Sequence, residues 1–168
     1  MPLRKIITVP EPVLRRRAHK VADFGPDLQI LIDDMVETMR AAPGVGLAAP
    51  QVNVSQRVIV VEFGDEEDEQ TPARLYTVVN PEIVRPSQET EKGTEACLSI
   101  PGFLGEVERV ASLTVKGQNR HGQPIRIKAK GWLARIFQHE IDHLDGVLFT
   151  DRALWVRKIE DGEDVPLD

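Results

Sequence analysis

The stretch QHEIDHLDG, residues 138–146, contains the HExxH pattern, in which two histidines four positions apart flank a glutamate. On a helix, residues four apart lie above one another on the same face, so the imidazoles of His139 and His143 can hold one cation. Glu140 then points toward the coordination position that is left open for water. The pattern therefore predicts a helix that builds a hydrolytic metal site, with metal-activated water as the nucleophile.

Apolar residues at helical spacing accompany this pattern, and Asp145-Gly146 supplies a helix stop. The apolar residues are Leu133, Ile136, Phe137, Ile141 and Leu144. On a packed helix, a pair of uncompensated histidines would be costly to bury. The context therefore favours metal ligands over a solvated histidine pair.

A third protein ligand is expected, because catalytic zinc-type sites commonly keep three protein donors. The metzincin pattern would place a histidine where Phe149 stands, and phenylalanine cannot ligate. Glu163 is a second candidate, but it lies in an acidic stretch, residues 160–166, that is punctuated by glycine and proline. Cys97 is the third candidate and the only cysteine. The residues alone leave it between a ligand and a small buried hydrophobe.

Two further segments complete a family pattern. In chain order, GVGLAAPQ (residues 44–51), EACLS (residues 95–99) and QHEIDHLDG closely resemble the three signature motifs of the peptide deformylase family. Pro12-Val13-Leu14-Arg15 resembles the opening segment of that family, and the resemblance extends to about Arg152. The chain is identified as a member of this family on these motifs.

The resemblance implies a role for each matching residue. It implies that Cys97, His139 and His143 bind the metal, with water or hydroxide in the fourth position. Glu140 matches the general acid/base of the family. The side chain of Gln51 and the backbone N–H of Leu98 match the donors that stabilise the oxyanion of the formyl group.

The resemblance also implies the reaction and the partners. Similar enzymes remove the N-formyl group from the initiator methionine of nascent peptides and release formate. One divalent ion is implied, with Fe2+ as the native metal and Zn2+, Ni2+ or Co2+ as substitutes. A transient encounter with the ribosome follows from the substrate.

Two residues depart from the family pattern. Ala96 replaces the usual glycine, which would strain the loop by about 1 kcal/mol or more if this position required a positive φ, but we expect the alanine to be accommodated. Glu11 replaces a commoner aspartate.

An apolar pocket beside the metal is expected to accept the methionine side chain. The candidate substrate-binding residues are Gly44, Val45, Gly46, Trp132 and Ile136. Arg135 is expected at the rim of the pocket or in solvent. Backbone pairing with residues 44–47 or 99–103 would allow many peptide sequences to bind.

A length of 168 residues with 41% hydrophobic content suits one domain spanning residues 1–168, with a variable acidic tail at 153–168. A helix is predicted over 27–42, with an apolar stripe of Leu28, Leu31, Met35 and Met39. Strands are predicted over 57–63, 75–84, 113–116 and 125–128, with a hairpin turn at His121-Gly122. The fold class is α+β, with mostly antiparallel strands packed around a central, C-terminal HExxH helix and with an N-terminal helix.

Charge and cysteine content limit the function classes. The formal charge of −6 argues against nucleic-acid binding, and no apolar run has the length of a membrane span. A single cysteine and no signal-peptide-like segment indicate the cytoplasm. Two alternatives to a deformylase stay open: a metallopeptidase that uses Glu163, and a metal-binding homologue that is catalytically idle.

Overall fold

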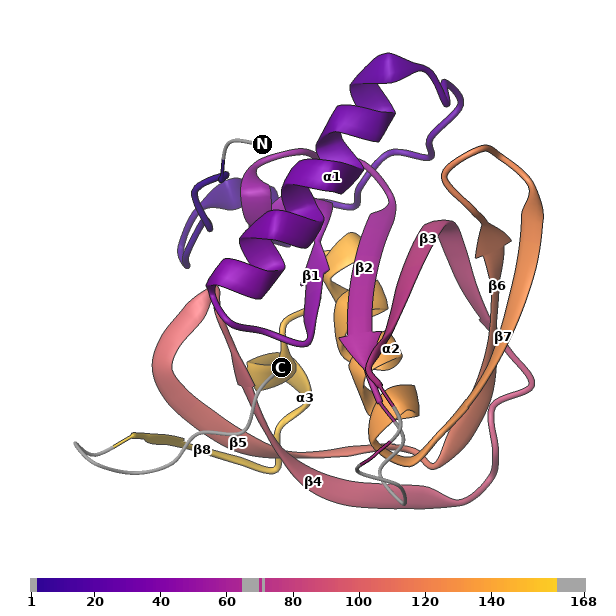
Figure 1. Ribbon diagram of the computed structural model, residues 1–168. Coiled ribbons are helices and arrows are strands. Elements are labelled where there is room, and N and C mark those ends of the chain that lie inside the picture. The colour runs from indigo at the N-terminus through magenta and orange to yellow at the C-terminus, as the bar shows by residue number, and fades with distance from the viewer. Residues whose placement is uncertain (1–2, 65–69, 71, 160–168) are drawn as a thin grey trace.

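Two antiparallel sheets organise the chain, which a computed structural model describes over residues 3–64, 70 and 72–159 (Figure 1). The acidic run at 65–69 and residues 160–168, which include Glu163, lie outside the described residues. The first sheet has the strand order β1-β2-β3-β6-β7. Its strands are β1 (Gly46–Ala48), β2 (Val58–Phe63), β3 (Arg74–Val84), β6 (Ser112–Gln118) and β7 (Pro124–Lys130).

The second sheet has the order β4-β5-β8. It consists of β4 (Thr90–Cys97), β5 (Ile100–Val110) and β8 (Trp155–Lys158). Neighbouring strands are antiparallel in both sheets. Three α-helices, α1 (Pro26–Ala41), α2 (Gly131–Leu144) and the short α3 (Phe149–Arg152), complete the described chain together with two 3-10 helices, η1 (Pro12–Arg15) and η2 (Ala49–Val52).

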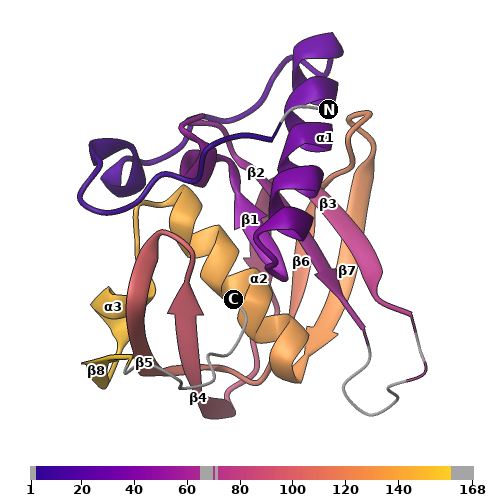
Figure 2. The ribbon, with the colours of Figure 1, turned by 60° about the vertical axis from the view of Figure 1, so that its left-hand side comes forward.

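Strand β2 is buried on both of its faces, which explains why it is a continuous apolar run. Val58 and Val60 belong to the core cluster that α1 covers, whereas Ile59 and Val61 belong to the cluster that α2 covers. Successive side chains of a strand point to opposite faces of its sheet. The two long helices therefore pack on opposite sides of the five-stranded sheet, as Figures 1 and 2 show.

Helix α1 follows the predicted stripe closely. Its cap is Gly25 and Pro26 occupies the first turn, where a missing N–H costs nothing. The stripe residues Leu28, Leu31, Met35 and Met39 are all buried against the sheet. The predicted range, 27–42, differs from the observed one by a single residue at each end.

Helix α2 carries the HExxH residues and contacts strands of both sheets, including β1 and β5. The predicted stop is present, since Asp145 caps the helix and Gly146 has a φ of 75°. Arg57 Nη1 donates to the Leu144 carbonyl at 2.9 Å, and the Ala18 N–H donates to the same oxygen at 2.8 Å. The C-terminal end of the helix is thus held from two other segments.

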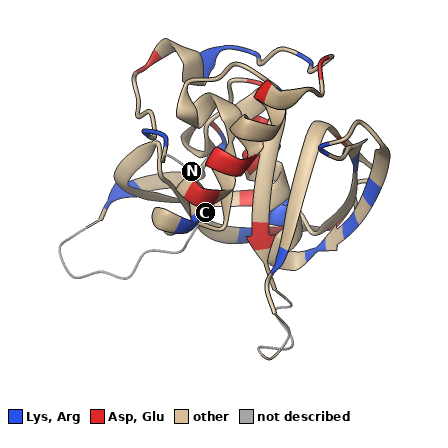
Figure 3. Ribbon diagram, turned by 45° about the horizontal axis from the view of Figure 1, so that its top comes forward, with Lys and Arg blue, Asp and Glu red and all other residues tan. Residues whose placement is uncertain are grey.

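Strand β7 is half-buried, and its apolar and basic residues alternate along the chain. Ile125, Ile127 and Ala129 contact the α2 core cluster, while Arg126, Lys128 and Lys130 are exposed. Figure 3 shows these basic residues recurring along the strand at the edge of the molecule. The alternation fixes the register with β6, because a slip of one residue would bury the charges.

The α+β class with antiparallel strands is confirmed. The four predicted strands correspond to β2, β3, β6 and β7, and the turn at His121-Gly122 joins β6 to β7. The sequence analysis did not predict β1, β4, β5 or β8 as strands. Residues 155–158 of the proposed tail form β8, which pairs with β5. In the described part of the chain, no helix is both long and apolar enough to cross a membrane.

The packing of α1 can be tested with one substitution at two positions. Ile32 is fully buried and Ile30 is 48% exposed on the same helix. We expect Ile32→Ala to lower the free energy of unfolding by about 2–5 kcal/mol, because it leaves a cavity, and Ile30→Ala to lower it by less than about 1 kcal/mol. Urea denaturation measures both values, and equal losses would contradict the assigned face of the helix.

Candidate metal centre

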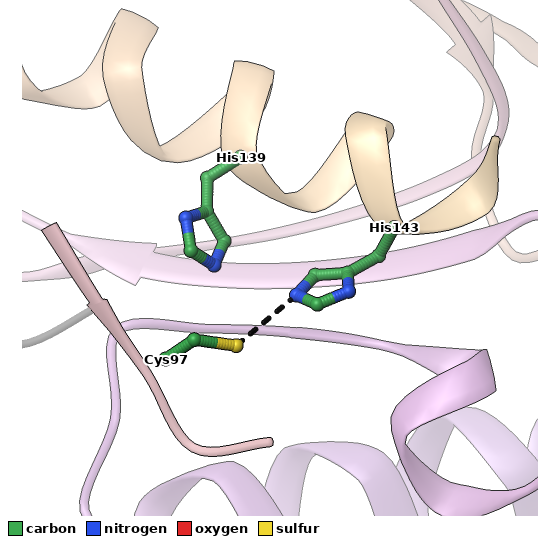
Figure 4. Close-up of side chains that lie close together, drawn as sticks. All are labelled: Cys97, His139 and His143. Carbon is green, nitrogen blue, oxygen red and sulfur yellow. Dashed lines mark hydrogen bonds between the residues drawn. The ribbon is translucent and has the colours of Figure 1, made fainter. Parts of the chain in front are cut away.

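Three potential metal ligands from distant parts of the chain meet in one buried place. Cys97 is the last residue of β4, and His139 and His143 lie one turn apart on α2. One ligand atom from each lies within 4.8 Å of the others, and Cys97 Sγ is 3.3 Å from His143 Nε2 (Figure 4). The structure therefore brings together the three residues predicted as ligands.

A carboxylate behind His139 orients its ring. His139 Nδ1 lies 2.9 Å from Glu95 Oε1, and an ionised carboxylate can only accept, so Nδ1 is the donor. The other ring nitrogen, Nε2, faces Cys97 and His143 (Figure 4), and in the neutral imidazole it is the nitrogen that carries the lone pair. A carboxylate that holds the outer nitrogen of a liganding histidine is a common feature of protein metal sites.

Glu95 is itself held by two arginines. Arg109 binds it in a bidentate manner, with Nε 2.9 Å from Oε2 and Nη2 2.8 Å from Oε1, and Arg135 Nη1 lies 2.6 Å from Oε2. Burial by itself raises the pKa of Glu95, but the hydrogen bonds from Arg109 and His139 hold that pKa well below its ordinary value. Glu95 consequently stays ionised and remains an acceptor for His139.

His143 is kept in the form that binds metal. It is 1% exposed, and its burial, followed by the nearby His139 and Arg109, lowers the pKa of His143 well below the ordinary value. A neutral imidazole has a lone pair available for a cation. The donor set of one thiol and two imidazoles fits a divalent transition metal, because sulfur and imidazole ligands suit Fe2+ and Zn2+.

Glu140 follows His139 on α2 and packs against strand β1. The residue is fully buried, and a Cβ added at Gly46 would lie 2.5 Å from Glu140 Oε2. No real side chain tolerates such a contact without a shift of its neighbour. Gly46 is therefore required for the close approach of the glutamate, which gives this glycine of the first motif a physical reason.

The amide of Gln51 has a defined orientation. Its Oε1 accepts from the Ala48 N–H at 3.0 Å, so Nε2 must point the other way, where it donates to Ser99 Oγ at 3.1 Å and lies 3.7 Å from Cys97 Sγ. The N-terminal segment holds both loops, since Ile7 N–H donates to the Gln51 carbonyl and Val9 N–H to the Ser99 carbonyl. The amino group of Gln51 is thus fixed beside the metal ligands.

The condition for strain at Ala96 is not met. Ala96 lies inside β4, paired with Leu104, and it is not among the described residues with a positive φ. Extended backbone accommodates alanine without a penalty, as we expected. Leu98 follows directly in the turn between β4 and β5 and packs against the α1 core cluster.

Phe149 occupies the position at which a metzincin would have its third histidine. Its ring stacks on His139, with centroids 6.2 Å apart and an angle of 20° between the planes. Phe149 is 2% exposed, so it shields His139 from water. Glu163, the alternative ligand, lies outside the described residues.

Three of the predicted substrate residues belong to one core cluster or pack against it. Ile136 is buried in the α2 core cluster, and the partly buried Val45 and Trp132 pack against that same cluster. Gly44 donates its N–H to the Met39 carbonyl at 2.8 Å, at the end of α1. Arg135 is neither at a rim nor in solvent, because it is 4% exposed and bonded to Glu95. The expectation for Arg135 was wrong.

The charged residues that lie behind the predicted ligands were not found from the sequence. Glu95 was quoted only as part of a motif, Arg109 and Asp142 were given no role, and Arg135 was expected at the pocket rim or in solvent. One signal was available for Glu95: two residues before Cys97 in a strand, it faces the same side as the cysteine. No spacing rule could have found Arg109, because its partners Glu95 and Asp142 come from different elements.

Comparisons with known proteins agree with the geometry. The family model for polypeptide deformylase matches residues 3–158. A peptide deformylase of Symbiobacterium thermophilum is 50% identical over 165 residues, which cover 98% of this chain and 73% of the relative. One of Natranaerobius thermophilus is 48% identical, with 91% of this chain and 94% of the relative covered.

Solved structures show the same similarity. The crystal structure of peptide deformylase from Thermotoga maritima has a TM-score of 0.84 at 42% identity, covering 91% of this chain and 99% of that chain. The enzyme from Ehrlichia chaffeensis in complex with actinonin has a TM-score of 0.84 at 41% identity, covering 90% and 89%.

Metal content distinguishes the two candidates for the third ligand. We expect Cys97→Ser to weaken Zn2+ binding by more than the roughly 10- to 100-fold that loss of a group behind a ligand costs, because a direct soft donor is removed. Glu163→Gln serves as the matched control and should retain the metal. Competition with a chelator measures both affinities; weakened binding in Glu163→Gln alone would assign the third ligand to the glutamate.

Proposed function

This chain belongs to the polypeptide deformylase family, and we propose that Cys97, His139 and His143 hold its metal while Glu140, Gln51 and Leu98 act on the substrate. Its reaction is the metal-dependent hydrolysis of the N-formyl group from the terminal formyl-methionine of nascent peptides. The observation that carries the assignment of roles is the approach of the three ligand atoms to within 4.8 Å.

The metal would be held by one thiolate and two imidazoles. A bound divalent cation supplies the nucleophile at neutral pH, because it lowers the pKa of coordinated water from 15.7 toward about 7. We propose Fe2+ as the native ion on the resemblance to the family, with Zn2+, Ni2+ and Co2+ as substitutes. The donor set suits each of these ions, so it does not select one of them.

Glu140 is the proposed general base and acid. Its carboxylate accepts a proton from the attacking water and later delivers it to the amine nitrogen when the bond between the formyl carbon and that nitrogen breaks. The products are formate and the free N-terminal amine. The position of Glu140 against Gly46, one residue after His139, supports this role.

Gln51 and Leu98 are the proposed donors to the formyl oxygen. Nε2 of Gln51 is aimed toward Cys97 by the bond that Oε1 accepts from Ala48, and Leu98 is the residue that follows Cys97. Hydrogen-bond donors fixed beforehand stabilise the negative charge that develops on this oxygen. Loss of one such donor typically costs about 10²- to 10³-fold in kcat.

The edge of β1 is the proposed peptide-binding strand. Within the described residues β1 pairs only with β2, so it ends the five-stranded sheet. Segment 99–103 overlaps β5, which already pairs with β4 and β8. A substrate strand can therefore add to residues 44–47 by backbone hydrogen bonds. Val45, Trp132 and Ile136 are proposed to accept the methionine side chain, with Gly44 and Gly46 allowing close approach.

The wider organisation is part of the same proposal. Contacts of α2 with strands of both sheets support a central position for this helix in one domain over residues 1–168. The acidic segment from residue 153 onward is proposed as variable. We also propose a cytoplasmic location and a transient ribosome encounter, since nascent peptides are presented there. A metallopeptidase or an idle metal-binding homologue would not release formate.

The decisive experiment measures formate release from formyl-Met-Ala-Ser, with metal content determined on the same sample. We expect turnover by the wild type and a loss of about 10²- to 10⁴-fold in Glu140→Gln, with the metal retained. This result separates catalysis from binding, because Glu140 is not a proposed ligand. Metal-replete wild-type protein without turnover would support the idle homologue instead.

Gly46→Ala tests the placement of Glu140 independently. The added methyl group would displace the Glu140 carboxylate, and a misplacement of about 1 Å can cost roughly 10²-fold in rate. We expect kcat/KM to fall by about that factor while the metal content and the thermal unfolding midpoint stay close to the wild-type values. Unchanged turnover would show that the close contact with Gly46 has no catalytic importance.

A further inference from the structure

Arg135 connects the helix that carries the histidines to the sheet that carries the cysteine. Its Nη1 donates to Glu95 Oε2 at 2.6 Å and to the Val107 carbonyl at 2.9 Å, and its Nη2 donates to the Glu91 carbonyl at 2.8 Å. Glu91 and Glu95 belong to β4 and Val107 to β5. One guanidinium thus joins α2 to two strands and to the carboxylate that orients His139.

The position of Arg135 on α2 is important for this connection. Arg135 is four residues before His139 and Asp142 is three residues after it, so all three lie on one face of the helix. Asp142 is bonded to Arg109 of β5 at 2.6 Å. The helix is therefore attached to the second sheet one turn before and one turn after His139. A further bond joins Gln138 to Val110, near the far end of β5.

Arg109 alone cannot replace the first attachment. Arg109 lies on β5 and Glu95 on the neighbouring β4, so their bidentate pair joins two strands of the same sheet. Within the described residues, hydrogen bonds from Arg135 and His139 join the Glu95 carboxylate to α2. Without Arg135, Arg109 would still fix the carboxylate to the second sheet, but the bond to His139 would be its remaining direct link to the helix.

Gly93 of β4 makes room for the guanidinium. A Cβ added there would lie 2.8 Å from Arg135 Cζ and 3.0 Å from its Nε. Gly93 is not among the residues with positive φ, so the glycine is required by space and not by backbone conformation. Arg135 Cζ also lies 5.5 Å from the centre of the Trp132 ring, over its face. The guanidinium is thus packed against a glycine and an aromatic ring as well as hydrogen-bonded.

We propose that Arg135 is a positioning residue of the metal centre, which fixes the Glu95 carboxylate against α2 so that His139 presents Nε2 to Cys97 and His143. The inference rests on the proposed ligand set and goes beyond it, because Arg135 is not itself a ligand. The planar fork of arginine reaches three acceptors in different directions, which the single ammonium group of lysine cannot do. Arg135→Lys should therefore retain only part of the effect.

Three variants test the inference on Co2+-loaded protein. Arg135→Met keeps an unbranched side chain but removes its donors, Arg135→Lys keeps the charge, and Gly93→Ala displaces the guanidinium without changing any charged residue. Arg152→Met is the matched control, because Arg152 is bonded to Asp142 but not to Glu95. Release of Co2+ to a chelator, the visible Co2+ spectrum and unfolding of the metal-free protein are measured for each.

We expect Arg135→Met and Gly93→Ala to weaken Co2+ binding by about 10- to 100-fold, the usual cost of losing a group behind a ligand, with a changed Co2+ spectrum. Arg135→Lys should fall between them and the wild type, and Arg152→Met should match the wild type. The double variant Gly93→Ala, Arg135→Met should lose no more affinity than Arg135→Met alone, because both changes act on one contact.

One pattern of results would overturn the inference. Variants that unfold more easily without metal, yet keep the wild-type Co2+ affinity and spectrum, would make Arg135 a purely structural residue and overturn the inference. If Arg135→Met does not fold, Arg135→Lys and Gly93→Ala decide the matter. Wild-type protein that binds no Co2+, or binding that Cys97→Ser leaves unchanged, would instead refute the ligand set on which the inference rests.

Discussion

The Glu95 carboxylate is the group on which the rest of the site depends. It is 4% exposed and accepts hydrogen bonds from Arg109, Arg135 and His139. A buried charge of this kind is tolerated only when it is fully paired, and removal of one partner leaves the others uncompensated. The network therefore stabilises one arrangement of β4, β5 and α2, and with it one distance between Cys97 and the two histidines.

The fold provides two different environments around α2. Toward the five-stranded sheet the helix is covered by apolar side chains such as Ile59 and Val61, which hold it by burial without specifying direction. Toward the second sheet the contacts are charged or polar, through Arg135, Gln138 and Asp142. Hydrogen bonds require a defined geometry. The apolar side thus stabilises the helix, and the polar side determines where its histidines lie.

The chemistry follows from the same division. Cys97, His139 and His143 lie in a buried site in which water is largely excluded, so that fixed donors act strongly on a developing charge. Gln51 enters from η2, whose position depends on the N-terminal segment through Ile7. Glu140 approaches because Gly46 has no side chain. The proposed reacting groups therefore come from three elements, β4, α2 and η2, and only the assembled fold brings these groups together.

The sequence by itself determined what local spacing can determine. Four-residue periodicity placed His139 and His143 on one face, the stripe Leu28, Leu31, Met35 and Met39 located α1, and the motifs identified the family. The strand at 125–128, which lies in β7, and the turn at Gly122 were also predicted from the sequence, because strand and turn preferences are local.

Tertiary structure decided the remainder. The backbone conformation of Ala96 and the burial of Arg135 depend on partners far along the chain, and no local pattern encodes such partners. The approach of Cys97 to His139 and His143 was also not predictable from spacing, since the distance between β4 and α2 is set by long-range packing and buried ion pairs.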